Sequence, residues 1–209
     1  MYDDTAKIEQ IEKALQSEPK NVKTETISLA LSIADAEDRD LQLLKITEFL
    51  AIKKDWNRAL GTAQLIESSY ERTDALHHVA AKLALTGHLE RALWIFNEAE
   101  KQALTAYSNW QQAELLQKLA KSLVEIGATF KAGELLEKSV FVAEQGQESL
   151  NLQDSLDASS VLAESILIFA SFVGTKRAFA LAKTIRNDAI REKTLVNLAE
   201  HPVSEKLAA

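Results

Sequence analysis

The sequence contains no cysteine, and only two prolines and six glycines occur in its 209 residues. Without cysteine there is no disulfide framework, no thiolate metal site and no thiol catalysis. The scarcity of proline and glycine leaves few turns for strands and hairpins. Strong helix formers dominate instead, and hydrophobic residues make up 46% of the chain. We therefore expect an all-α protein with a sizeable core.

Long apolar runs and an amino-terminal basic segment are also missing. The first ten residues, MYDDTAKIEQ, are acidic where a signal peptide is basic. The longest apolar run, ILIFASFV at 166–173, is too short to span a bilayer. A formal net charge of -7 argues against nucleic acid as the main ligand, because phosphate contacts need clustered lysine and arginine. We expect a cytoplasmic protein that binds neither membranes nor nucleic acid.

The chain does contain an internal repeat of 33 residues. Residues 58–80 align without gaps on residues 177–199, with seven identical positions. Four of these, Ala63, Ile66, Arg72 and Leu76, also match residues 33 positions earlier. A period of this length predicts helix pairs that stack on their neighbours.

A turn residue closes the first helix of each expected pair. These residues are Lys54, Gly87, Gly127 and Gly174, separated by 33, 40 and 47 positions. The longer units exceed the shortest by seven and fourteen residues, and every seven residues make almost two helical turns. An apolar stripe therefore keeps its direction, and long units can stack on short ones.

Capping residues place the helix ends. Ser69, Asn109 and Asp188 precede the first helix of successive units, and Asn109 with Gln112 approximates a capping box. We expect a single helical-repeat domain over 1–209, with an amino-terminal helix, a repeat core at about 22–200 and a short flexible tail at 201–209. The eleven expected helices are 4–17, 22–36, 39–53, 56–68, 70–86, 89–104, 109–126, 129–145, 154–173, 175–187 and 189–200.

Residues 76–99 have the spacing of the tetratricopeptide repeat. The matching positions are the small Ala80, the turn glycine Gly87, Ala92 five residues later, the aromatic Phe96 and the small Ala99. The chain resembles this family over roughly 39–200, and its longer units look like the extended variants common in bacterial regulators. Other units depart from the pattern, since the earliest has lysine for the turn glycine and the third has leucine for the aromatic. The resemblance implies a right-handed α-solenoid of antiparallel helix pairs.

The resemblance also implies a concave groove lined by the first helix of each pair. Polar and small side chains there suit an extended peptide or a partner helix. Trp110 begins one of these helices and is the best candidate for a partly exposed anchor. The expected partner-binding residues are Asp74, His77, Ala81, Trp110, Glu114, Gln117, Lys121, Glu164 and Ile168.

The strongest candidates for chemistry are Asp74, His77, His78 and His88. Asp74 and His78 are one helical turn apart, but His77 projects about 100° away from His78 and His88 lies past the turn. We therefore expect no metal site, no cofactor and no catalytic residue. The alternative is an enzyme or sensor that binds a metal or small ligand through His77 and His78.

Three further features allow two interpretations each. The recurrent Arg39, Arg72 and Arg191 are interpreted as structural rather than as an anion site. Basic residues gather in 176–193, so an RNA-binding repeat is a second alternative function. The apolar helix at 166–173 is either buried within the chain or forms a homo-oligomer contact.

From these observations we expect a non-catalytic bacterial scaffold or adaptor that binds another protein or a peptide.

Overall fold

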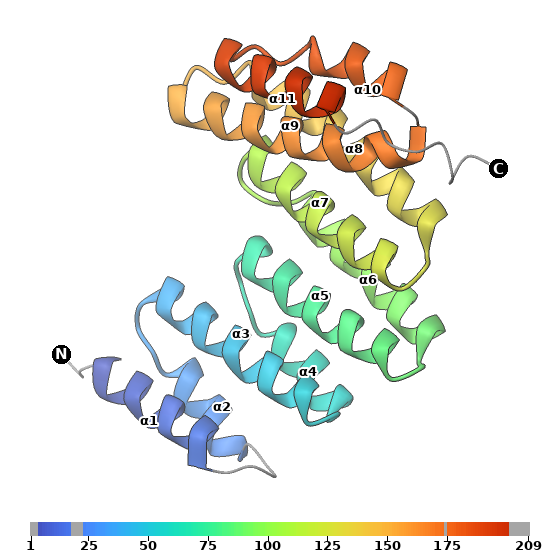
Figure 1. Cartoon of the computed structure of the whole chain (residues 1–209). Helices are drawn as coiled ribbons and strands as arrows, with labels where there is room; N and C mark the ends of the chain where they lie inside the picture. Colours follow the sequence, from blue (N-terminus) through green and yellow to red (C-terminus); the bar gives the residue numbers. More distant parts are fainter. Residues whose placement is uncertain (1–3, 18–22, 174, 201–209) are drawn as a thin grey trace. The chain divides into compact units, whose positions relative to one another are not determined.

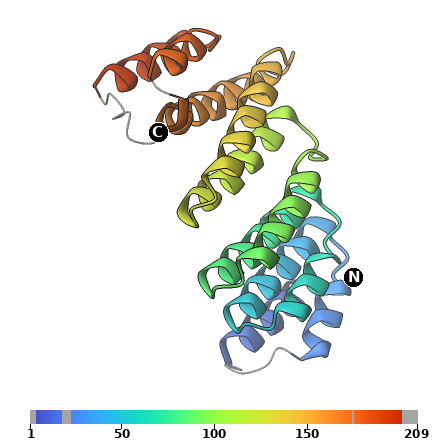
Figure 2. The same ribbon diagram turned by 90° about the vertical axis from the view of Figure 1, so that its right-hand side faces the viewer.

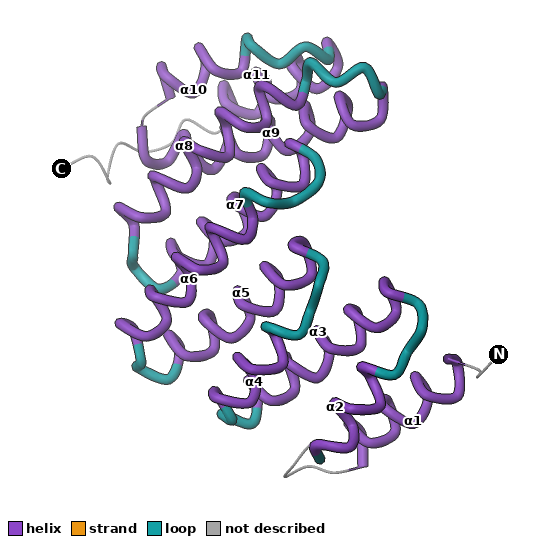
Figure 3. Tube along the Cα trace, turned by 180° about the vertical axis from the view of Figure 1, so that it is seen from behind, coloured by secondary structure: helices purple, strands orange, loops and turns teal. Residues whose placement is uncertain are grey.

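A computed structural model describes residues 4–17, 23–173 and 175–200. These residues form eleven helices and no strand (Figures 1 and 3), which confirms the all-α prediction. The expected turn at Gly174 and tail at 201–209 lie outside the described residues. The helices are α1 (Asp4–Ser17), α2 (Thr24–Leu31), α3 (Ala36–Ile52), α4 (Trp56–Ala63), α5 (Ser69–Leu85), α6 (Leu89–Ala103), α7 (Asn109–Glu125), α8 (Thr129–Gly146), α9 (Leu152–Val173), α10 (Thr175–Ala182) and α11 (Asp188–Glu200).

The helices belong to two compact units, Met1–Gln102 and Ala103–Ala209. In unit 1, α3 contacts α4 and α5, while α1 and α2 contact each other and α3. In unit 2, α9 contacts α7, α8, α10 and α11. Figure 2 shows the same helices side by side within each unit. A single continuous array over the whole chain stays a prediction.

Among the helices that follow a loop, α3, α7 and α11 begin with a side-chain cap, whereas the side chain of Ser68 does not cap α5. Asp35 Oδ1 accepts from the amide of Asp38 at 3.0 Å, and Asn187 Oδ1 accepts from the amide of Ile190 at 3.0 Å. Ser108 forms a reciprocal capping box with Gln111. A cap must lie outside the helix to reach the third helical amide. The predicted caps were therefore one residue late, because Ser69, Asn109 and Asp188 are each the first residue of a helix.

The predicted turn residues do end their helices in the left-handed conformation. Gly87 has φ 88° and Gly127 has φ 79°, while Lys54 has φ 62° although it carries a side chain. The hydrogen bonds after the three helices are also alike. The amides of Asp55, His88 and Ala128 reach back to carbonyls five residues earlier, as in a Schellman motif.

Three of the predicted helices are wrong at their carboxyl ends. The structure ends α2, α4 and α10 after eight residues each, where longer helices were expected. In the loop that follows each, one isoleucine is buried: Ile33, Ile66 and Ile185 are 3%, 0% and 1% exposed. The repeated isoleucine therefore anchors a loop to the core rather than extending a helical stripe.

The recurrent arginines support the same loops, as the structural interpretation predicted. Arg72 Nε donates to the carbonyl of Ile66 at 2.7 Å, and Arg191 Nη1 donates to that of Ile185 at 2.8 Å. Arg39 instead pairs with Glu67 in the loop after α4, at 2.8 Å. Arg72 and Arg191 thus bind backbone carbonyls, and Arg191 also pairs with Asp188 at 2.6 Å.

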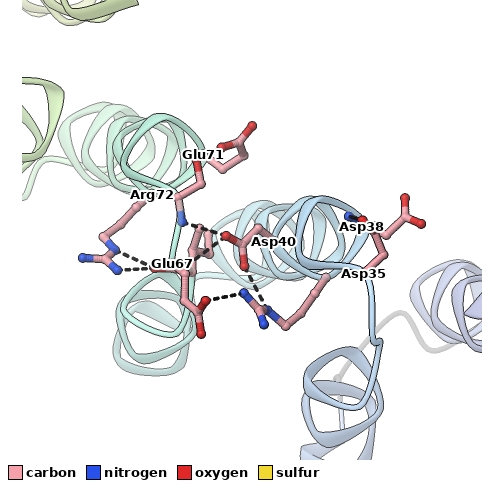
Figure 4. Close-up of polar contacts among 9 residues, drawn as sticks. Asp35, Asp38, Asp40, Glu67, Glu71 and Arg72 are labelled. Atoms are coloured by element: carbon pink, nitrogen blue, oxygen red, sulfur yellow. Dashed lines mark hydrogen bonds and ion pairs between the residues drawn. The ribbon is translucent and has the colours of Figure 1, made fainter. Parts of the chain in front are cut away.

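A side chain from an earlier helix or loop accepts hydrogen bonds from the backbone amides of these loops. Asp40 on α3 is buried, and its Oδ2 accepts from the amides of Glu67 and Ser68 at 3.0 and 2.7 Å (Figure 4). Asp4 on α1 accepts in the same way from the amides of residues 34 and 35. Gln147, just after α8, accepts from the amide of Arg186 at 2.7 Å. These bonds satisfy backbone donors of the loops and fix each loop to its neighbour.

The small and aromatic positions of residues 76–99 lie in the core. Ala80, Ala92, Phe96 and Ala99 are all fully buried. Small side chains at such positions allow helices to approach closely, and the phenylalanine fills the remaining volume. The predicted burial of this stretch is therefore confirmed.

Candidate functional site

A recess in unit 2 lies where α7 begins, beside the loop that joins α8 to α9. Its volume is about 410 Å³. Trp110 forms part of the lining and is half-buried, whereas Tyr107 is 99% exposed. The recess is lined by Tyr107, Ser108, Asn109, Trp110, Gln145, Gly146, Glu148, Ser149 and Asp154.

Polar groups of the recess are fixed by contacts within unit 2. Trp110 Nε1 donates to Asp154 Oδ1 at 3.2 Å, which orients the indole. Glu148 accepts from Arg186 at 2.7 Å. The lining therefore combines two aromatic rings with two carboxylates, a chemistry suited to a basic side chain with an apolar stem.

Gly146 ends α8 at the wall of the recess, where no larger residue fits. A Cβ atom at this position would lie 2.9 Å from the Cβ of Ala158 and 3.2 Å from the Cβ of Asn109. The missing side chain therefore lets α8 approach the start of α7 and the first half of α9. The expected helix at 129–145 ends one residue before this glycine, and no sequence pattern indicated the close approach.

Four predicted binding residues share one stripe of α7. Trp110, Glu114, Gln117 and Lys121 follow helical spacing, and all but the buried Gln117 are partly exposed. Lys121 forms an ion pair with Glu164 on α9. The structure thus brings predicted residues of α7 and α9 together, and two of them, Lys121 and Glu164, pair with each other.

Gln117 belongs to a buried polar network rather than to an open surface. Its amide lies 3.1 Å from the hydroxyl of Ser165 on α9. That hydroxyl lies 2.9 Å from Ser139 on α8, which donates to the carbonyl of Ala113 at 2.7 Å. The network joins three helices, so Gln117 has a structural role in unit 2.

The predicted residues of unit 1 lie on α5. Ala81 is half-buried, while Asp74, His77 and the neighbouring His78 gather with ligand atoms within 4.8 Å of one another. We expected His77 to project away from the other two, and the structure corrects this expectation. Its Nδ1 lies 3.6 Å from Asp74 Oδ1, because residues three and four apart meet on one helical face. His88 is exposed and stands outside the cluster.

Glu48 on α3 contacts this cluster, although no sequence pattern indicated it. Its Oε1 lies 2.8 Å from His78 Nε2, so two helices supply the group. Such a contact depends on which helix faces α5. Helical periodicity in the sequence does not specify that pairing.

The basic segment 176–193 is largely occupied by ion pairs. Arg177 pairs with Glu137, Arg186 with Glu148 and Arg191 with Asp188. Lys176, Lys183 and Lys193 are exposed.

The apolar run at 166–173 contributes to the core of unit 2. Ile166, Phe169 and Ala170 are buried, and Leu167 and Ile168 are half-buried. Of the groove residues, Ile168 therefore offers only part of its surface to a partner. Among the described residues, none of the helices combines the length and the apolar composition needed to cross a bilayer.

Comparison with known proteins gives a fold but no family. No protein-family model matches the chain, and no curated protein sequence matches it. The crystal structure of Ton1535 from Thermococcus onnurineus NA1 is similar, with a TM-score of 0.54 and 19% sequence identity. The similarity covers 97% of this chain and 57% of that chain, so this chain spans little more than half the length of that protein. At this identity the similarity concerns the fold alone.

Proposed function

We propose that the protein is a non-catalytic interaction module, a tetratricopeptide-like solenoid that binds a peptide or a partner helix. The observation that carries this proposal is the aromatic recess at the start of α7. A side chain as exposed as that of Tyr107 has no packing role, and contact with a partner is a common reason for such an aromatic. Leu150 and Leu152, in and after the loop that lines the recess, are likewise almost fully exposed.

The chemistry of the recess indicates which residue of a partner it receives. The rings of Tyr107 and Trp110 favour a cation placed over an aromatic face, and Asp154 and Glu148 supply negative charge nearby. We propose that an arginine or lysine of the partner enters the recess. The exposed leucines beside it contact apolar residues of the same peptide.

The stripe on α7 gives the peptide its direction. Glu114 and Lys121 follow Trp110 at one and three turns along the helix. A peptide anchored at Trp110 therefore passes charged groups of both signs, and a partner with the opposite charge order is selected. In unit 1, the half-buried Ala81 offers part of its surface from α5, whereas His77 is buried; Glu164 and Ile168 are the residues that α9 contributes.

The experiment is affinity capture from the source organism, repeated with single variants of the full chain. Tyr107→Ser and Trp110→Ala remove the two rings, and Phe130→Ala is the matched control because it removes another aromatic of unit 2 that is 82% exposed. We expect the rings to act as hot spots, so each recess variant weakens binding of the captured protein at least about tenfold while the control binds normally.

A second arm tests the chemistry of the partner. Synthetic peptides from the captured protein are titrated against the chain, and each arginine or lysine is replaced by glutamate in turn. One replacement should abolish binding. Equal binding by all three protein variants, or by every glutamate peptide, would contradict the proposal.

A further inference from the structure

A second group of side chains, in unit 1, has the composition of a metal site. Asp74, His77 and His78 lie on α5 with one ligand atom each within 4.8 Å of the other two. Glu48 approaches from α3, with its carboxylate oxygen 2.8 Å from His78 Nε2. Two imidazoles and one carboxylate of α5 thus lie close together, and the Glu48 carboxylate of α3 contacts one of the imidazoles.

The distances fit a compact coordination shell. Asp74 Oδ1 lies 3.6 Å from His77 Nδ1 and 3.8 Å from His78 Nε2. In a tetrahedral zinc site with bonds of about 2.0 Å, neighbouring ligand atoms are about 3.3 Å apart. The observed separations exceed this value by a few tenths of an ångström, which small side-chain rotations close.

The surroundings also favour a bound cation. His77 is 9% exposed and its ring lies 6.4 Å from that of Phe96, so one side of the group faces the core. His78 and Glu48 are about one third exposed, which leaves a path from solvent. Partial burial strengthens the attraction between a cation and the two carboxylates.

The donor set selects the class of metal. Imidazole nitrogen with carboxylate oxygen suits zinc and neighbouring divalent transition metals, whereas calcium and magnesium prefer oxygen alone. We propose that Asp74, His77 and His78 bind one divalent transition-metal ion of the zinc class, and that the adjacent Glu48 supplies the fourth donor after a rotation of its side chain. Four protein donors fill a tetrahedral shell, so the ion links α3 to α5 rather than activating water. This proposal is independent of the recess in unit 2.

The test is titration of the full chain, without a histidine tag, with zinc chloride followed by calorimetry. We expect one ion per chain and a higher thermal midpoint, since an ion that binds only the folded state stabilises it. Cobalt chloride supplies a second readout, because four-coordinate cobalt gives strong visible absorption bands. Absence of saturable binding by both metals would overturn the proposal.

Variants locate the ion. Asp74→Asn preserves shape, and His78→Ala removes a partly exposed side chain, so both should fold as judged by circular dichroism without metal. Each should weaken zinc binding at least about tenfold and remove the cobalt bands. His88→Ala is the matched control, because His88 is an exposed histidine outside the cluster. Retained binding by both cluster variants, or loss of binding in the control, would overturn the assignment.

Discussion

Replacement of Lys54 by glycine should stabilise the protein. Lys54 has φ 62° at the end of α3, where the two equivalent turns use Gly87 and Gly127. The left-handed conformation costs a residue with a Cβ atom about 1 to 2 kcal/mol. Glycine loses more freedom on folding, which offsets about 0.5 to 1 kcal/mol of the gain. We expect a net increase of about 0.5 to 1 kcal/mol, or roughly 1 to 4 °C in Tm.

The assay is thermal unfolding of the full chain followed by circular dichroism at 222 nm. Lys54→Ala is the control, because it removes the charged side chain but retains the unfavourable φ, and it should leave Tm nearly unchanged. Gly87→Ala is the reverse change. No atom lies within 4 Å of the added Cβ, so only the backbone conformation opposes it, and Tm should fall. If Lys54→Gly is no more stable than Lys54→Ala, backbone strain at this turn is not significant.

Three further changes test other parts of the structure. Gly146→Ala should lower stability by about 1 to 3 kcal/mol through steric overlap. Gly133→Ala, in the interior of α8 with open space around it, should instead raise Tm. Equal Tm values for the two variants would contradict this reasoning. Gln147→Ala removes a buried side chain that accepts from Ser159 on α9 and from the amide of Arg186 in the loop after α10, and urea unfolding should show a loss of about 1 to 3 kcal/mol. The side-chain hydrogen bond from Lys7, aided by the amides of Ala34 and Asp35 in the loop after α2, lowers the pKa of Asp4 below its usual 3.8. The stabilising contribution of Asp4 is therefore present above pH 3.8 and disappears as the pH falls through the lowered pKa. Asp4→Asn should therefore flatten the acid limb of the Tm against pH curve, and an unchanged limb would exclude this role.

The helices themselves were predictable from local signals. Gly87 and Gly127 marked the turns because few other residues adopt a positive φ, and helical periodicity placed the buried Ala80 and Phe96 correctly. These features depend on residues a few positions apart, which the sequence displays directly.

The ends of the short helices were not predictable in this way. α4 stops at Ala63 because Ile66 turns into the core and Asp40, more than twenty positions earlier, accepts the amides of the following loop. Periodicity alone continues the helix through Ile66. Local propensity therefore yields to a contact that only the folded unit creates.

The same distinction between local signals and contacts created by folding applies to the candidate sites. Trp110 was chosen as an anchor because an aromatic at the start of a helix often remains partly exposed, and the structure places it at the recess. The approach of His77 to Asp74 depends on side-chain rotation, and the contribution of Glu48 depends on the neighbour of α5. Neither can be obtained from spacing along one helix.

The acceptors that hold the loops have a consequence for biosynthesis. Asp4, Asp40 and Gln147 each precede the amides that they bind by about thirty to forty residues. A chain emerging from the ribosome thus exposes every acceptor before its donors leave the exit tunnel. We expect nascent segments to dock in order from the amino terminus, whereas a fragment lacking the early residues would begin with an unsupported loop.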